Sequence, residues 1–357
     1  MMRVKGITLT IEFDGWALNR DENLGGNERT IKKIKKDGQI YSFISSKSLR
    51  HHLFWTLHDR FNWPITDCVA DKDTEKSDDK SVVVQPDLTK HNIITSPELD
   101  AFGYMYTIKG DMGLSRKAPV GITHAIALNP WDGTSHVMAN HDFARRVPNA
   151  TPIPVKEEND YNTFRASFTI DVGRLGVDEW YVNRVEYKDG ELSLIKIQVI
   201  ITGSEKKGNL KIEKKPIFTH TVKAEKLSDN EYKLDKGRII IEELKPETDK
   251  DAGLVRVKFI VDEDEKKRRI YQIMTVIKNG LMYRVGTDCG IKPLRLYVAG
   301  LEVAMPVLHY GDFDSDYIVK DGGEPLVYKY DHKNIQGQEK QRWHEFLKRL
   351  GVGVWEK

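Results

Sequence analysis

The chain has 357 residues, of which 39% are hydrophobic and 31% are charged, and its formal net charge is only +2. This composition indicates a soluble globular protein of one large domain or two ordinary ones, and no apolar run approaches the ~18 residues that a membrane span needs. Cys68 and Cys289 are too few for a disulfide framework or a zinc site, so we expect a cytoplasmic protein without a signal peptide, membrane anchor, metal or cofactor.

Residues 4–13 alternate between apolar and polar side chains, which predicts a half-buried strand. A turn at Gly25-Gly26 follows, and then a basic run, "RTIKKIKKDGQIYSFISSKSLR", spans residues 29–50 with Asp37 as its single acid. Such a local cationic surface in a near-neutral protein is expected for polyanion binding. An ordinary solvated charged face is the alternative.

The end of the basic run opens a predicted helix over residues 46–61, with Ser45 or Ser46 as its N-cap. A helix start offers unpaired N–H groups that suit an oxyanion. Lys47 and Arg50 lie in the first turn and a half, where cations oppose the helix dipole unless an anion lies between them. The alternative is a serine-capped helix with solvated lysine and arginine.

Further along the chain, residues 67–92 form an exposed excursion, and residues 129–163 form a long irregular stretch. A second helix is predicted over residues 265–279, ending at Gly280, and a short last helix stops at Gly351. The remaining predicted strands cover residues 101–108, 164–172, 181–187, 192–202, 238–243, 254–261, 281–286 and 294–303.

Without its excursions, the chain runs strand, helix, strands, helix, strand, which is the βαββαβ plan of an α+β, ferredoxin-like (RRM-like) fold. We therefore expect one domain over residues 1–357, with insertions at 64–100 and 129–163.

The histidines raise the alternative of catalysis. His51 and His52 point about 100° apart on a helix and cannot easily share one substrate atom. His136 and His141 lie in an irregular stretch without a third ligand at a metal-binding spacing. His51 with His124 could act as the acid and base of a ribonuclease only if the fold brought them together. No P-loop, dinucleotide fingerprint or nucleophile elbow is present.

Three ordered segments resemble a known family: "LNRDE" and "ISSKSLRHHL" near the start, "FGYM…APVGITHAIALNPW" over residues 102–131, and the "KRRIYQIMTVIKNG" helix. They are similar to the "Cas seven" family, the CRISPR-associated backbone subunit of type I Cascade complexes, in its DevR-like, type I-B branch. The resemblance implies a right-hand shape, in which a ferredoxin-like palm carries a finger at 64–100 and a β-hairpin thumb at 129–163.

The family resemblance also implies a function without catalysis. Family members polymerise along CRISPR RNA (crRNA) in a helical filament with other Cascade subunits, and they display the guide for pairing with a target DNA strand. Such binding is dominated by phosphate contacts and is indifferent to guide sequence.

By position in the motifs, the resemblance assigns RNA contacts to the palm and wedge residues to two other places. Met105 matches the wedge strand, and Met138 and Phe143 are the thumb candidates for wedging between bases. The palm residues are Asn19, Arg20, Lys33, Lys36, Ser45, Ser46, Lys47, Arg50, His51 and His124.

Two enzymatic alternatives remain open. One is a guide-processing endoribonuclease that uses His51 or His124, and the other is a type III-like backbone in which Asp142 of the thumb cuts target RNA.

Overall fold

The computed structural model describes residues 4–17, 20–21, 27–70, 84–109, 111–202, 211–243, 254–282, 290–334 and 337–355. The chain divides into two compact units, each made of separate stretches of sequence. Unit 1 comprises residues 1–61, 121–171 and 270–357, and unit 2 comprises residues 62–120 and 172–269. The excursion expected at 64–100 is thus part of a unit that also contains 172–269.

Unit 1 is built on one antiparallel sheet whose central strands are β1 (Gly6–Trp16) and β14 (Tyr161–Asp171). Its strands follow the order β26 (Val327–Asp331), β23 (Arg295–Leu301), β1, β14, β11 (Ala125–Ala127), β5 (Gln39–Ile44) and β4 (Lys33–Lys36), and β10 (Val120–Ile122) also pairs with β14.

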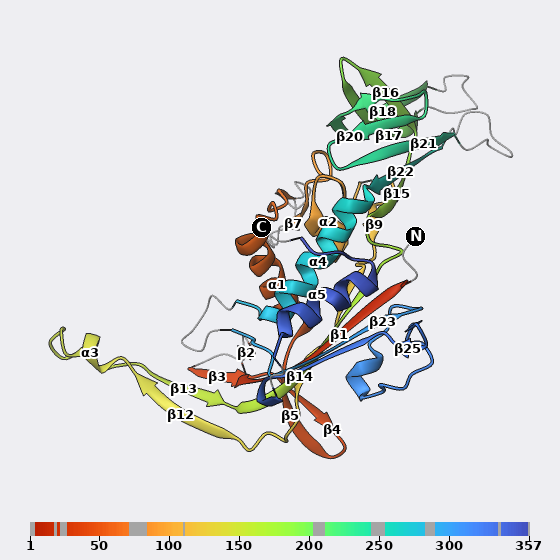
Figure 1. The fold of residues 1–357 in the computed structure, drawn as a ribbon. Helices are drawn as coiled ribbons and strands as arrows, with labels where there is room; N and C mark the ends of the chain where they lie inside the picture. The colour runs from red at the N-terminus through yellow and green to blue at the C-terminus, as the bar shows by residue number, and fades with distance from the viewer. Residues whose placement is uncertain are drawn as a thin grey trace. The chain divides into compact units, whose positions relative to one another are not determined.

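Helix α1 (Ser46–Phe61) follows β5 in the chain, and helix α4 (Glu263–Asn279) precedes β23. Figure 1 shows α1 and α4 on one side of β1 and β14. Leu49, Leu53 and Leu57 of α1 are fully buried, as the helical spacing of the sequence predicts. The core-facing residues of the sheet and α4 are Ile7, Leu9, Ile11, Phe13, Phe164, Ala166, Phe168, Ile170, Ile270, Ile273, Met274 and Ile277.

The opposite face of the sheet corrects one prediction. The alternation of residues 4–13 predicts a half-buried strand, but Thr8, Thr10 and Glu12 are also at most 4% exposed. The cover on this side includes the short helix η3 (Val307–Tyr310), because His309 contacts Ser167 of β14. Strand alternation reports polarity, and it cannot report that a distant segment covers the polar face.

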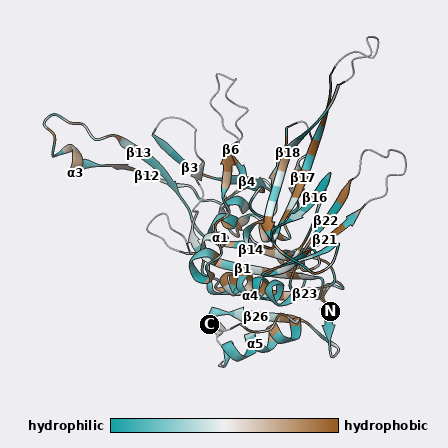
Figure 2. Ribbon diagram, turned by 90° about the horizontal axis from the view of Figure 1, so that it is seen from above, coloured by the Kyte–Doolittle hydropathy of each residue, from teal (hydrophilic) through white to brown (hydrophobic). Residues whose placement is uncertain are grey.

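A hairpin arm projects from the sheet of unit 1 (Figures 1 and 2). It consists of β12 (Thr134–Ala139) and β13 (Pro154–Asn159), with the short helix α3 (His141–Ala144) at its tip. Its base is joined by β3 (Glu28–Ile31) and β2 (Arg20–Asp21). The irregular stretch at 129–163 is therefore mostly a regular hairpin, and its prolines lie near or beyond the strand ends, where they remove no ladder bond.

The remaining elements of unit 1 lie toward the C-terminus. Helix α5 (Glu339–Leu350) buries Trp343, Phe346, Leu347 and Leu350 and ends at Gly351, which has a φ of 79°. The others are β24 (Lys320–Asp321), β25 (Glu324–Pro325) and η4 (His332–Asn334).

Unit 2 contains a five-stranded and a three-stranded antiparallel sheet around its own core, in which Trp180 is 1% exposed. Its elements are β6 (Cys68–Ala70), β7 (Val84–Pro86), α2 (Pro97–Phe102), β8 (Tyr104–Tyr106), β9 (Leu114–Arg116), β15 (Val177–Val182), β16 (Arg184–Lys188), β17 (Glu191–Thr202), β18 (Lys211–Lys223), β19 (Glu225–Lys226), β20 (Glu231–Leu234), β21 (Gly237–Glu243) and β22 (Val255–Val261).

Two local predictions in unit 2 have different outcomes. The hairpin turn at Asp189-Gly190 is confirmed, and both residues have positive φ, as a two-residue hairpin turn requires. The strand predicted over residues 101–108 is wrong at its start. Ser96 accepts a hydrogen bond from the N–H of Leu99 and Pro97 occupies the first turn, so this serine-proline signal begins helix α2 before β8.

Of the strand predicted over residues 281–286, Leu281 forms a single bridge with Ile291, and residues 283–286 lie outside the described residues.

Candidate RNA-binding surface

The start of α1 is held by two side-chain acceptors. Ser45 is the N-cap, and its Oγ accepts from the N–H of Ser48 at 3.2 Å. His124, from the loop before β11, accepts at Nδ1 from the N–H of Ser46 at 2.9 Å. Two of the N–H groups at the helix start therefore have acceptors within the chain, and an anion at this turn would have to compete with His124.

Two cationic side chains and two histidines lie around this helix start. Lys47, Arg50 and His51 are exposed on the first turn and a half of α1, and His124 is exposed beside them. The imidazole of His124 also lies 5.0 Å, between ring centroids, from the ring of Phe43 in β5. The predicted cluster of Ser45, Lys47 and Arg50 is thus joined by His124, 78 residues away in sequence from Ser46.

The histidines on α1 have different environments. His52 is buried, and burial, together with the neighbouring His51, lowers its pKa to about 4. A buried neutral imidazole packs as part of the helix face, whereas His51 remains at the surface.

The polar face of the unit 1 sheet carries a row of directly opposed residues across six strands. In register they are Asp331, Arg295, Glu12, Arg165, Ile126 and Phe43. Glu12 lies between Arg165 and Arg295, and its carboxylate accepts from Arg165 Nη2 at 2.6 Å and from Arg295 Nη1 at 2.8 Å. Burial acts to raise the pKa of Glu12, but the two arginines outweigh it and hold that pKa below its ordinary value.

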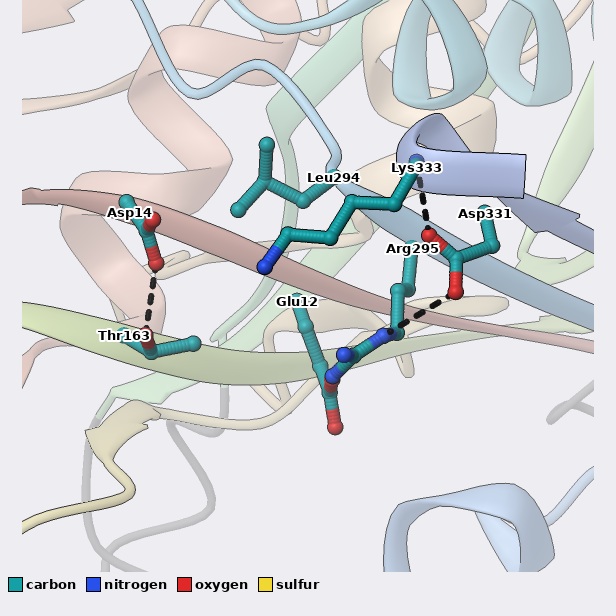
Figure 3. A pocket seen from close by; sticks show the side chains of 7 residues that line it. All are labelled: Glu12, Asp14, Thr163, Leu294, Arg295, Asp331 and Lys333. Atoms are coloured by element: carbon teal, nitrogen blue, oxygen red, sulfur yellow. Dashed lines mark hydrogen bonds and ion pairs between the residues drawn. The ribbon is translucent and has the colours of Figure 1, made fainter. Parts of the chain in front are cut away.

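Beside this row is a small cavity of about 110 Å³ (Figure 3). Asp14 accepts a hydrogen bond from Thr163 at 2.6 Å at its edge, and Lys333 donates its backbone N–H to Asp331 at 2.9 Å. The lining residues are Glu12, Asp14, Thr163, Leu294, Arg295, Asp331 and Lys333. With three carboxylates and two cations, the cavity has no strong preference for an anion.

The basic strand β4 presents its lysines in two ways. Lys33 is paired with Glu158 of the arm base at 2.7 Å, and its ammonium lies 3.8 Å from the ring centroid of Trp131. Contact between Lys33 and a phosphate would require this pair to open. Lys36 is exposed. Burial lowers the pKa of His309, and the positive charges of Arg165 and Lys36 lower it further.

The arm presents large apolar side chains to solvent. Met138 of β12 is 42% exposed and Phe143 of α3 is 62% exposed. Asp142 is paired with Arg146, whose guanidinium also lies 5.1 Å from the ring centroid of Phe143. An isolated two-stranded hairpin with such side chains exposed gains little stability of its own in water.

The other predicted site residues lie elsewhere. Met105 of β8 is 76% exposed and belongs to unit 2. Asn19 lies outside the described residues, and Arg20 is described only by its backbone, which pairs with Ile31. In the described part of the chain, no three His, Cys, Asp or Glu side chains are grouped to hold a metal ion.

Sequence reasoning missed the network on the polar face of the sheet. Ser167 links Thr10 at 2.7 Å to His309 at 2.9 Å, and Glu12 links two arginines from β14 and β23. The only signal was the run of polar residues alternating with the apolar ones in residues 4–13 and 164–172.

None of the helices in the described stretches has the length and apolarity needed to cross a membrane. No curated protein sequence matches this chain.

Among solved structures, a "CRISPR RNA-guided surveillance complex, pre-nicking" chain matches with a TM-score of 0.47 and 9% identity, over 97% of this chain and 88% of the other. A "CRISPR RNA-guided surveillance complex" chain matches with a TM-score of 0.38 and 8% identity, over 97% and 83%. A "Type IV-B CRISPR Complex" chain gives 0.24 and 13%, over 46% and 71%.

The sequence itself matches a family described as "CRISPR-associated negative auto-regulator DevR/Csa2" over residues 7–321. This match spans all three motif segments and confirms the resemblance seen in them. The chain belongs to the DevR/Csa2 family of CRISPR-associated proteins.

Proposed function

We propose that this protein is a non-catalytic, multi-copy crRNA-binding subunit of a type I-B Cascade complex. The observation that carries the proposal is the helix start of α1, where Lys47, Arg50 and His51 are exposed beside His124, within a chain of the DevR/Csa2 family. Two cations, Lys47 and Arg50, beside two histidines at one helix start suit the sugar-phosphate chain, and such contacts do not depend on guide sequence.

We assign the palm to unit 1 and give it a ferredoxin-like fold. The strand order β23, β1, β14, β11, with α1 between β1 and β11 and α4 between β14 and β23, supports this assignment. Additional strands extend the sheet at both edges, and the basic strand β4 lies at one of them.

In this proposal the arm of β12 and β13 is the thumb. Its exposed Met138 and Phe143 fold over the guide on a neighbouring copy and separate the bases at intervals, so that the copies form a helical filament with the other Cascade subunits. Unit 2 includes the finger at 64–100, and the exposed Met105 on β8 of the same unit is the candidate on the wedge strand. The displayed guide pairs with a target DNA strand in the cytoplasm.

The absence of catalysis is also part of the proposal. Nδ1 of His124 accepts a hydrogen bond from a backbone N–H, so this nitrogen is not available to take a proton, and the carboxylate of Asp142 is paired with Arg146.

Co-expression with a guide RNA and the other Cascade subunits tests the proposal. We expect the protein to co-purify as an RNA-bound multimer whose mass, from light scattering, falls after ribonuclease treatment. A protein that remains free of RNA, or a multimer whose mass is the same before and after nuclease, would overturn it.

A further inference from the structure

The polar face of the unit 1 sheet is closed at one end and open at the other. Thr8, Thr10 and Glu12 of β1 are buried on this face, where η3 contacts both β1 and β14. Asp14 and Trp16 follow Glu12 by two and four residues, so they lie on the same face, because side chains alternate along a strand. Both are exposed. The end of this face near the arm is therefore accessible at β1.

Two aromatic side chains stand together at this open end. Trp16 of β1 lies directly opposite Tyr161 of β14 in the strand register. Their ring centroids are 5.3 Å apart with an interplanar angle of 71°. Trp16 is 38% exposed and Tyr161 is 61% exposed, so both rings are accessible to a ligand.

The position of this pair in the sheet is informative. RNA-recognition motifs stack bases on aromatic side chains carried by a four-stranded antiparallel sheet. Here the two aromatics lie on the adjacent central strands β1 and β14, at the end where these two strands extend beyond their pairing with β23 and β11. They also lie on the sheet face opposite α1 and α4, and in an RNA-recognition motif the face without helices is the one that binds RNA.

Charged side chains of both signs lie on this face, so its charges alone do not select an anion, and the aromatic pair is the feature that suits the bases of a nucleic acid. Arg165 and Arg295 lie on the same face about 13 Å along the strands, and they remain 34% and 42% exposed beyond their pairing with Glu12. Lys333 lines the cavity together with Arg295 and Asp14. The carboxylate of Asp14 already accepts a hydrogen bond from Thr163.

We infer that Trp16 and Tyr161 form a platform on which bases of single-stranded RNA stack, separate from the phosphate contacts at the start of α1. The inference rests on the proposed function and deepens it, because it gives the chain a base-contacting site on the palm. Stacking on an aromatic ring is tolerant of base identity, so the platform is compatible with guides of any sequence.

Binding of two matched ligands to the full-length protein tests the platform. One ligand is a labelled oligouridine RNA, and the other is a sugar-phosphate oligomer of the same length without bases. Replacing Trp16→Leu together with Tyr161→Leu keeps apolar bulk but removes the rings, and we expect about a tenfold or greater loss of affinity for the RNA. Affinity for the abasic oligomer and the salt dependence should not change, because no phosphate contact is lost.

Two further variants make the result specific. Trp16→Phe with Tyr161→Phe should restore most of the RNA affinity, and Trp355→Leu, at a tryptophan that is also 38% exposed, should change neither ligand. Equal RNA affinity for the double leucine variant and the wild type would overturn the platform alone, as would an equal loss for both ligands. A wild-type protein that binds neither ligand, even in the presence of its partner subunits, would overturn the proposed function as well.

Discussion

The imidazole of His124 accepts a hydrogen bond from the backbone N–H of Ser46, at 2.9 Å, and so holds the first turn of α1 from outside the helix. Ser45, the N-cap, holds the same turn by accepting a hydrogen bond from the N–H of Ser48. A helix start that carries two exposed cations is unfavourable by itself, and these two acceptors stabilise it.

Replacing His124→Ala should lower the free energy of unfolding by about 1 kcal/mol, since one N–H at the helix start loses its acceptor. His124→Asn should lower it less, because the amide oxygen can accept the same bond. Urea unfolding followed by circular dichroism measures both variants, with His51→Ala as an exposed control on the same helix. Equal loss in the Ala and Asn variants would show that the hydrogen bond is not the cause.

Removing Lys47 and Arg50 together, as Lys47→Ala with Arg50→Ala, should weaken guide binding for every RNA sequence alike. If each side chain contacts one phosphate, the slope of log K against log salt should become shallower by about 1.4 units on a single strand. A salt titration of fluorescence anisotropy measures this. The matched control is Lys348→Ala with Arg349→Ala on α5, which removes the same charge from the same unit; an equal effect in this control would refute the assignment.

The buried carboxylate of Asp100 should be a major source of stability in unit 2. Asp100 is fully buried and receives Arg116 Nη2 at 2.7 Å and Arg269 Nη1 at 2.7 Å. Asp100→Ala removes the carboxylate that these two buried arginines share and leaves Arg269 with Glu265 and Arg116 with Asp178, so we expect a loss of about 3 kcal/mol in the free energy of unfolding. Denaturant titration measures the loss.

The control for this loss is Asp229→Ala, which removes a carboxylate paired with Lys226 at the surface. It should lower the free energy of unfolding far less than Asp100→Ala does, because water screens an exposed ion pair. Comparable losses in the two variants would contradict the role of buried charge.

Stability should fall as the pH is lowered from 6.5 toward 4, in part through His220. Burial of this imidazole lowers its pKa from 6.5 to about 4 in the folded protein, so unfolding takes up a proton within this range. The stability is fully present above pH 6.5 and decreases by on the order of 3 kcal/mol as the pH approaches 4. His220→Gln should flatten this part of the curve of unfolding free energy against pH. An unchanged slope in the variant would show that His220 does not titrate as described.

Precursor guide RNA should remain uncut by the purified protein, because Nδ1 of His124 is engaged with the helix start. Gel analysis of labelled precursor measures this, with His51→Ala plus His124→Ala and Asp142→Ala as comparison variants. Cleavage by the wild type that disappears in the double histidine variant would establish the endoribonuclease alternative. Cleavage of target RNA that disappears in Asp142→Ala would establish the type III-like one.

Local patterns in the sequence were sufficient for most elements. Helix 46–61 agrees with α1 at both ends, because its leucine stripe and serine cap are properties of a single segment. The helix predicted at 265–279 and the last helix agree with α4 and α5 for the same reason. The start of α2 was missed although its signal, a serine before a proline, is equally local.

The arm and the second unit were less accessible to sequence reasoning. Residues 134–139 and 154–159 pair across a 14-residue connection, and neither strand has a buried face, so they lack the alternation of a half-buried strand. Unit 2 combines two distant stretches, and no linker composition marks their boundaries.

The sequence by itself determined the family, the main helices and the basic helix start, since each of these depends on residues close together in the chain. Only the tertiary structure decided that Glu12 receives Arg165 and Arg295, and that Trp16 lies beside Tyr161, because these contacts depend on which strands pair and in which register. Register arises from the packing of whole faces in three dimensions, and local periodicity carries no information about it.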